Sequence, residues 1–377
     1  MFYYEPWDKW IVTRYEDVNA LLRDKRLGRV LHGRRSESEE LDYQRSLRPE
    51  HAAFDAIQKG SLLELEPPDH TRIRTAVHAA FTPKHVRKLT GKIEALCERL
   101  VESLKDLDEP FDLLEHYAEP IPVTVIADLL GIPEPDRPQL IPWSKAIIGM
   151  FEPERNAQQE VAAVDAAAEF ADLIRALMTK KRRHPQDDLL TRFTQTHDAD
   201  PQILSEGEVV ANAILFLNAG HEAVVNVIGN GVYALLRHPE QKRRLQENPD
   251  LLSSAIEEMM RFDTPLQFFE RFTFEDIDYK DVHFPRGSKL CLYYASANHD
   301  EEVFEAPATF DIARAPNPHI AFGLGLHYCI GAPLARLELA SALNTLLTAF
   351  PNLQLSEIPE YQHKNVFRYL KRLEVSI

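Results

Sequence analysis

Cysteine is scarce in this sequence: Cys97, Cys291 and Cys329 are the only three among 377 residues. No two of them have the short spacing of a zinc knuckle or of a C-x-x-C redox site, so neither kind of site is expected. No signal segment precedes the first helical pattern. Scarce cysteine and the lack of a signal segment favour a reducing, cytoplasmic setting.

Positive charge and long apolar runs are also limited. There are 43 Lys and Arg residues against 59 Asp and Glu, and the resulting net charge of -16 argues against general binding to nucleic acid or anionic membranes. We find no run of about 18 apolar residues, so no membrane anchor is expected. The 44% hydrophobic and 27% charged content is typical of a globular protein with a substantial core.

Regular alternation of strand and helix is missing, which argues against a doubly wound parallel sheet. Helical periodicity dominates instead. Helices are predicted over residues 16–23, 70–105 with a break at Thr82-Pro83, 111–131, and from Ser205 to about Leu236. Short strands are predicted near residues 10–14, 269–274, 289–294 and 372–377. Residues 151–200 are polar and alanine-rich, which predicts surface helices and a loop. The expected fold is one mainly α domain with a minor β part, residues 1–377.

The helix predicted from Ser205 is the longest in the chain. Ser205 and Glu208 have the spacing of a capping box, and the apolar pattern stops before His238-Pro239. Roughly 30 residues at about 1.5 Å each give a helix about 45 Å long. So long and apolar a helix is expected to pass through the centre of the core.

A glycine-rich loop around Cys329 carries the strongest chemical pattern. It reads Phe322-Gly-Leu-Gly-Leu-His-Tyr-Cys-Ile-Gly-Ala-Pro-Leu-Ala-Arg-Leu-Glu338, and a helical pattern follows the cysteine. The glycines permit backbone angles and close approaches that a side chain would block. At a helix start, free N–H groups and the dipole lower the pKa of a thiol. On these residues alone, Cys329 is a small buried apolar residue, a reactive thiol or the ligand of a haem iron.

The loop resembles the haem-binding signature of the cytochrome P450 family at Phe322, Gly323, Gly325, His327, Cys329 and Gly331. The continuation through Glu338 is similar to soluble bacterial members. This resemblance implies a triangular prism of helices around a buried haem b, which Phe322 contacts and whose iron Cys329 ligates as a thiolate. Covalent attachment is not expected, because C-x-x-C-H is absent. The resemblance extends from Trp10 onward and implies an N-terminus shorter than is usual in the family.

Further motifs contain cationic residues that are candidates for binding the same cofactor. In Glu66-Pro-Pro-Asp-His-Thr-Arg-Ile-Arg74, His70 and Arg74 lie one helical turn apart, which suits a pair of carboxylates or a solvated surface. The family resemblance implies that they contact the haem propionates, as do Arg271 and His327. The family usually has Asp where this chain has Glu66, a change expected to be harmless.

Glu258 and Arg261 have the i, i+3 spacing of an ion pair on one helix face. In isolation such a pair is most often solvated. The resemblance implies instead the buried E-x-x-R pair of the family, which contacts a later loop, here residues 310–314. Arg314 is expected to complete that network.

The long helix contains Ala219-Gly-His-Glu-Ala-Val-Val-Asn226, where the family typically has Ala-Gly-x-acid-Thr. Ala219 and Gly220 are expected to leave room for dioxygen, and Glu222 to supply protons as a catalytic residue. Ala223 replaces the threonine and cannot donate a proton. One hypothesis is that a hydroxyl of the substrate, together with ordered water, takes over the role of the missing threonine hydroxyl. Peroxide-driven or poorly coupled catalysis, and a reaction other than hydroxylation, are the alternatives.

Two neighbours of this motif carry weaker expectations. Asn226 holds a water near Glu222 or serves in packing or capping. His221 occupies a variable position of the motif and is not expected to bind iron.

The resemblance implies a monooxygenase that inserts one oxygen atom from O2 into a hydrophobic small molecule. A peroxygenase, a haem-thiolate isomerase or reductase, and a non-catalytic haem sensor are the alternatives. Electrons are expected from a separate ferredoxin or flavodoxin with its reductase, because the chain has no flavin or nicotinamide fingerprint. The basic segment 70–92 is a candidate docking patch or a merely solvated face. Substrate contacts are expected from residues 54–63, 147–153 and 266–269 and from Ile214, Leu215, Asn218 and Val224.

Overall fold

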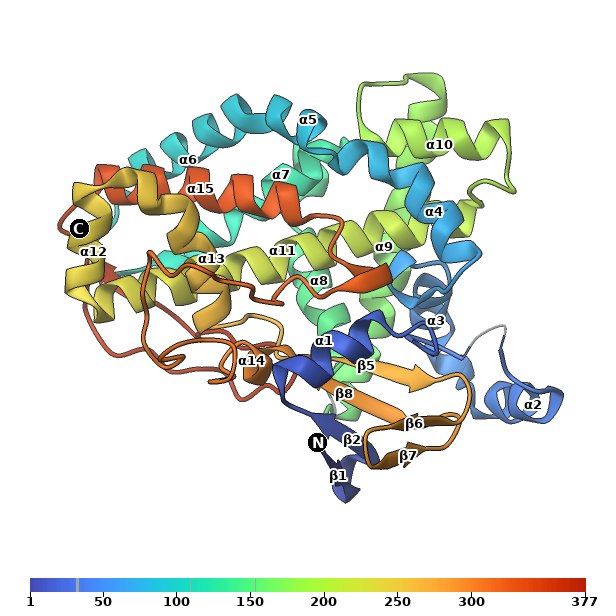
Figure 1. Cartoon of the computed structure of the whole chain (residues 1–377). Helices are drawn as coiled ribbons and strands as arrows, with labels where there is room; N and C mark the ends of the chain where they lie inside the picture. Colours follow the sequence, from blue (N-terminus) through green and yellow to red (C-terminus); the bar gives the residue numbers. More distant parts are fainter. Residues whose placement is uncertain (32–33, 109, 153) are drawn as a thin grey trace.

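The predicted central helix is present as α11, Glu206–Arg237. The computed structural model describes residues 1–377 apart from 32–33, 109 and 153. Ser205 and Glu208 form the predicted capping box, and the helix crosses the middle of the molecule (Figure 1). Among the described helices only α11 is long and apolar enough to cross a membrane, which the absence of long apolar runs did not predict. Its most apolar window is 72% buried inside the protein, as expected of a core helix.

The other helices surround α11. The N-terminal half contributes α1 (Tyr15–Arg23), α2 (Glu37–Ser46), α3 (Ala52–Lys59), α4 (Asp69–His78), α5 (Pro83–Val86), α6 (Thr90–Leu104), α7 (Pro120–Leu130), α8 (Leu140–Gly149), α9 (Ala157–Arg183) and α10 (Leu189–Ala199). After α11 follow α12 (Pro239–Glu247), α13 (Leu252–Phe262), α14 (Tyr294–Ala297) and α15 (Ala332–Ala349). The Thr82 hydroxyl accepts a hydrogen bond from His85 N and caps α5, with Pro83 at its first position as predicted.

Most of the strands lie together at one side of the molecule, near the N-terminus (Figure 1). The main sheet has the order β1-β2-β8-β5-β3, from Phe2–Tyr4, Lys9–Val12, Lys289–Tyr293, Phe268–Thr273 and Leu27–Gly28. β2 and β8 are parallel, and the other pairs are antiparallel. β4 (Phe111–Asp112), β10 (Glu374–Ser376) and β9 (Gln354–Leu355) form a second sheet, and β6 (Ile277–Tyr279) pairs with β7 (Val282–Phe284). The four strands predicted from the sequence correspond to β2, β5, β8 and β10.

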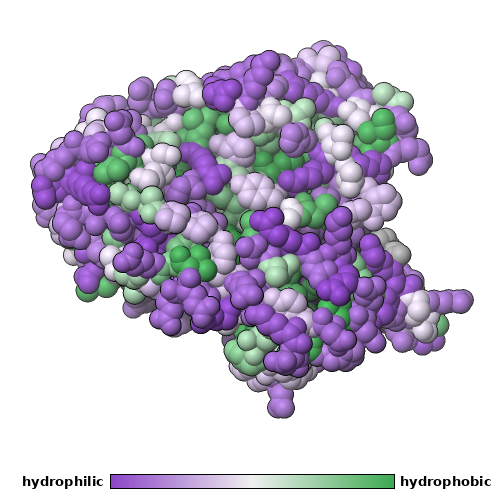
Figure 2. Space-filling model, in the orientation of Figure 1, coloured by the Kyte–Doolittle hydropathy of each residue, from purple (hydrophilic) through white to green (hydrophobic). Residues whose placement is uncertain are grey.

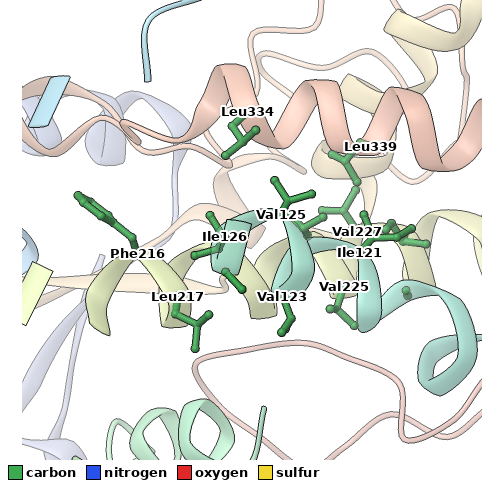
Figure 3. Close-up of a cluster of buried hydrophobic side chains, with 14 of the residues drawn as sticks. Ile121, Val123, Val125, Ile126, Phe216, Leu217, Val225, Val227, Leu334 and Leu339 are labelled. Atoms are coloured by element: carbon green, nitrogen blue, oxygen red, sulfur yellow. The ribbon is translucent and has the colours of Figure 1, made fainter. Parts of the chain in front are cut away.

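The core lies where α7, α11 and α15 meet. Figure 3 shows Ile121 and Ile126 of α7, Val227 of α11 and Leu339 of α15 in this apolar layer, and all four are buried. Dispersion contacts and the removal of apolar surface from water stabilise such a layer. It holds α11 firmly against the helix that follows Cys329.

The outer surface is polar. Figure 2 shows a mainly hydrophilic face with small, separate hydrophobic patches. Helix α2 projects from the body (Figure 1) and buries none of its residues. Its capping box at Ser36 and the ion pair between Glu39 and Arg286 hold it in place.

One helix prediction along the chain was wrong. Residues 111–131 do not form one helix, since strand β4 and a π-helical turn, Leu114–Ala118, precede α7. Asp112 explains the break, because its carboxylate accepts hydrogen bonds from Leu114 N and from Leu373 N near β10. The surface helices and the loop predicted within residues 151–200 are present as α9, α10 and the turn between them, and α9 packs one mainly apolar face on the body of the protein.

Candidate functional site

A cavity of about 430 Å³ lies between α11 and the loop that contains Cys329. It collects predicted site residues that are up to 259 positions apart, from His70 to Cys329. Its lining includes His70, Arg74, Ala219, Gly220, Ala223, Arg271, Phe322, His327 and Cys329. Nine of the ten predicted site residues therefore border one cavity. The exception is Glu222, which lies on an adjoining face of α11, outside the lining.

The Cys329 loop is fixed by its backbone. Cys329 N donates to Phe322 O at 3.0 Å, and Gly323 and Gly325 have φ angles of +67° and +71°, which favour glycine. A side chain on Gly325 would also lie 2.4 Å from Leu22 O. The loop therefore needs glycine at these positions to bring the cysteine to the cavity, ahead of α15.

The start of α15 was expected to lower the pKa of the Cys329 thiol, but burial of the side chain has the larger, opposite effect. Burial raises the pKa of the Cys329 thiol above its usual value, although N–H groups of Gly331 and Ala332 and the charge of Arg74 oppose this shift. The prediction of a lowered pKa was therefore wrong for the protein alone. A bound metal cation favours the thiolate of a cysteine that ligates it, and so reverses this balance.

Positive charge gathers at one end of the cavity. Arg271 is only 4% exposed, and the rings of His70 and His327 lie edge to face with centroids 4.7 Å apart. Burial and the neighbouring positive charges of His327 and Arg74 lower the pKa of His70 to about 4. Both ring nitrogens of His70 are buried and find no hydrogen-bond partner among the described residues. Buried donors without acceptors are costly, so this end of the cavity fits an anion.

Glu66 is the acidic member of this group. Its Oε1 accepts from His327 Nε2 at 3.1 Å and from Arg29 N at 2.6 Å. Burial raises the pKa of Glu66, but these contacts together outweigh it and leave that pKa below its usual value. Arg29, which the sequence did not single out, also lines the cavity and lies 4.1 Å over the ring of Phe269. Nothing local in the sequence marks Arg29, because β3 brings it to the site by pairing with β5.

The opposite wall is formed by α11. Ala219 and Ala223 present only methyl groups to the cavity, while Gly220 faces α7, where an added Cβ would lie 3.0 Å from Ile126. Glu222 is 8% exposed, and burial raises its pKa to about 7. Burial likewise lowers the pKa of His221 to about 3, so this histidine is neutral near pH 7, and it is not among the residues that line the cavity.

The comparisons with known proteins identify the family. The cytochrome P450 family model matches residues 44–372. This chain belongs to the cytochrome P450 family. It is 35% identical over 380 residues to the polyketide biosynthesis cytochrome P450 PksS of Bacillus subtilis, covering 98% of this chain and 89% of that protein. It is 37% identical over 373 residues to the vitamin D(3) 25-hydroxylase of Pseudonocardia autotrophica, covering 98% and 88%.

Solved structures agree with this assignment. The structure of P450BioI in complex with an acyl carrier protein ligated to hexadec-9Z-enoic acid has a TM-score of 0.90 and 34% identity, covering 98% of this chain and 92% of that one. The single-domain, mainly helical P450 fold predicted from the sequence is confirmed. The protein is a cytochrome P450 monooxygenase, and members of this family hold haem b through a cysteine thiolate and take electrons from redox partners.

The cavity of this P450 suits haem b by its donor set. Cys329 is the cysteine among its lining residues, while Cys97 and Cys291 are fully buried elsewhere. Cationic donors at one end match two carboxylates, and apolar side chains with Ala219 and Ala223 face the remaining space.

The Glu258–Arg261 pair is completely buried in this P450, with both side chains 0% exposed. Arg261 also donates to the carbonyls of Asn298 and Pro307, each at 2.9 Å. Arg314 Nε lies 3.1 Å from Glu258 Oε2, so the predicted network with the later loop is present. The solvated alternative for this pair is excluded.

The basic residues of segment 70–92 fall into two groups, one bound within the protein and one exposed. Arg72 binds Glu208 with Nη2 to Oε1 at 2.6 Å and Asp69 at 2.8 Å, so it ties α4 to the start of α11. Lys84, Lys88 and Lys92 are exposed on α5, the following turn and α6. Arg72 is thus engaged within the protein, whereas these lysines are exposed to solvent.

Proposed function

We propose that this P450 uses Cys329 as the iron ligand and oxidises a hydrophobic small molecule in the cavity under α11. The observation that carries the proposal is the joint lining: Cys329, the unpartnered His70 and the methyl face of Ala219 and Ala223 border one cavity. Phe322 is proposed to contact the haem, and His70, Arg74, Arg271 and His327 to bind its propionates.

Haem held by a cysteine thiolate supplies the activation of dioxygen when it is bound. The protein's own residues have three tasks. The cations orient the cofactor through its carboxylates, the apolar lining excludes water, and Glu222 stores a proton close to neutral pH because burial holds its pKa at about 7.

The substrate is proposed to be largely apolar. Of the expected contact regions, Ile57, Leu62, Ile148, Phe151 and Leu266 line the cavity, as do Ile214, Leu215 and Val224. Pro153, the end of one expected region, lies outside the described residues. Asn218 is the polar exception on α11, and its Oδ1 is buried without a partner. The names of the relatives, which mention polyketide biosynthesis, vitamin D(3) and a fatty acid on a carrier protein, support this class.

Substrate binding is the direct test of this proposal. Hydrophobic candidates are titrated into the ferric protein, and the shift in iron spin state is recorded. We expect saturable shifts with ligands that fill the cavity, and Leu215→Trp should weaken them about tenfold or more by taking up that space. Unchanged affinity in Leu215→Trp would place the substrate elsewhere.

Restoring the alcohol on α11 tests the role of Ala223. With Ala223→Thr, we expect more product for each NADH consumed with substrates that lack a hydroxyl near the reacting carbon. We expect little change with substrates that have one, because their own hydroxyl with ordered water already serves. Turnover with hydrogen peroxide replacing the reductase is the comparison. Peroxide turnover faster than NADH turnover for every substrate would favour the peroxygenase alternative.

Electron supply is proposed to come from an acidic ferredoxin or flavodoxin that docks on Lys84, Lys88 and Lys92. The face adjoins the Cys329 loop, because Arg74 of α4 donates to Tyr328 O at 2.8 Å and α5 and α6 pack on α15. We expect Lys84→Glu/Lys88→Glu to slow the first reduction about tenfold at low ionic strength. Lys59→Glu, an exposed lysine on α3, is the control. Equal rates in both variants would exclude docking there. We also propose a cytoplasmic location, because the separate ferredoxin or flavodoxin and its reductase must be able to reach this protein.

A further inference from the structure

A row of four polar side chains runs along α11, whose buried residues are mostly apolar. Asn218, Glu222, Asn226 and Asn230 are each four residues apart, so neighbouring members lie about 5–6 Å apart on one curved stripe of the helix. Their exposed fractions are 9%, 8%, 3% and 2%. Four buried polar groups in line require partners, since each unpaired one costs free energy.

The partners within the protein are insufficient. Asn218 Oδ1, Asn226 Nδ2 and Asn230 Oδ1 have no hydrogen-bond partner among the described residues. Within the described part of the chain, the side-chain amides of the row make one hydrogen bond, from Asn230 Nδ2 to Arg368 O at 3.0 Å. Asn226 is in mid-helix, which excludes the capping role, and its neighbours Val225 and Val227 belong to the apolar layer of Figure 3. Ordered water inside proteins binds buried polar groups that otherwise lack partners, and the Glu222 carboxyl, one turn from Asn226, offers such a water a second polar partner.

The row also joins two functional places. At one end Asn218 lines the cavity, and at the other Asn230 contacts the C-terminal segment whose Phe367 lines the same cavity. Glu222 and Asn226 lie between them, behind the methyl face of Ala223. Ala223 itself offers no hydroxyl for proton transfer at the cavity wall.

We propose that Asn226 holds an ordered water against the Glu222 carboxyl, and that Asn226 is thereby a positioning residue for proton delivery to the cavity. The proton leaves Glu222, the water passes one of its own to dioxygen undergoing reduction in the cavity, and solvent restores the proton on Glu222. The amide of Asn226 is never itself an acid. This inference rests on the proposed function of the cavity.

Other groups near Glu222 also influence the pKa of its carboxyl, and their effects must be distinguished from that of Asn226. His221 Nδ1 lies 3.7 Å from Glu222 Oε1 and is neutral. Lys145 of α8 and Glu119 before α7, paired with each other at 2.6 Å, act on Glu222 with opposite signs. Burial raises the pKa of Tyr369, and the nearby charges of Glu222 and Glu152 raise it further. All of these remain in place when only Asn226 is changed.

The test follows the carboxyl group directly. Infrared difference spectra of the ferric protein are recorded against pH, and Glu222→Gln identifies the Glu222 band. Water held by Asn226 stabilises the carboxylate, so Asn226→Leu should raise the midpoint of this titration by about one pH unit. Asn226→Ser, which keeps a small polar group for water, should restore most of the wild-type midpoint. Val225→Ala, an apolar change on the same turn, should leave the midpoint in place.

Catalysis gives a second readout. Asn226→Leu should consume NADH with less product and a larger solvent isotope effect, while its thiolate spectrum stays normal. If that spectrum is normal but neither the Glu222 midpoint nor the product yield changes, Asn226 is a packing residue and the inference is wrong. If the wild type lacks the thiolate spectrum, the proposed function itself fails.

Discussion

Cys329→Ala is expected to lose both the thiolate spectrum and the monooxygenase activity. The carbon monoxide difference spectrum of the reduced wild-type protein should show the strongly shifted Soret band of a thiolate-ligated haem. Cys329→Ala removes the thiolate donor of the cavity, so the shifted band should vanish and product should fall below detection. A shifted band that persists in Cys329→Ala would overturn the ligand assignment.

The other cysteines provide matched controls. Cys97 and Cys291 are each 0% exposed, and burial raises the pKa of both thiols to about 12, so neither is available as a thiolate. Cys97→Ala and Cys291→Ala should keep the shifted band, although each leaves a small cavity that costs about 1–3 kcal/mol. Loss of the band only in Cys329→Ala would separate ligation from core packing.

The site could be predicted from the sequence where its residues are local to a motif. His70 and Arg74 are one turn apart, Ala219, Gly220 and Ala223 share one helix, and Phe322, His327 and Cys329 share one loop. The capping box at Ser205 likewise fixed the beginning of α11 in advance, because its two hydrogen bonds join neighbours in the chain.

Residues that depend on long-range pairing could not be predicted. Arg29 comes to the cavity through β3, and Phe367 through a bridge between its own backbone and Leu266. The prediction of a lowered pKa for Cys329 was wrong for a related reason. The sequence shows the start of the helix, but it does not show the burial that raises the pKa of this thiol. The break at Asp112 depends on Leu373, which is 261 positions away.

Arg261→Leu is expected to cause the largest loss of stability. Arg261 is the largest fully buried side chain and holds Glu258 and three backbone carbonyls at Asn298, Pro307 and Thr309. Its removal leaves Glu258 buried with less compensation, which costs about 3–5 kcal/mol. The apparent free energy of unfolding by urea should fall by that amount, and haem should be lost at lower urea. A fall below about 1 kcal/mol would contradict the role of the pair.

An exposed ion pair serves as a control for the loss of stability expected in Arg261→Leu. Arg244 Nη1 lies 3.1 Å from Asp311 Oδ1, with side chains 48% and 39% exposed, so Arg244→Leu should cost at most about 1 kcal/mol. In Glu258→Leu/Arg261→Leu the buried carboxylate, which Arg314 alone would otherwise pair, is gone, and stability should partly return relative to Arg261→Leu. Full return is not expected, because the carbonyls of Asn298 and Pro307 still lose their donor. The double variant therefore separates the ion pair from the loop contacts that hold the segment leading to Cys329.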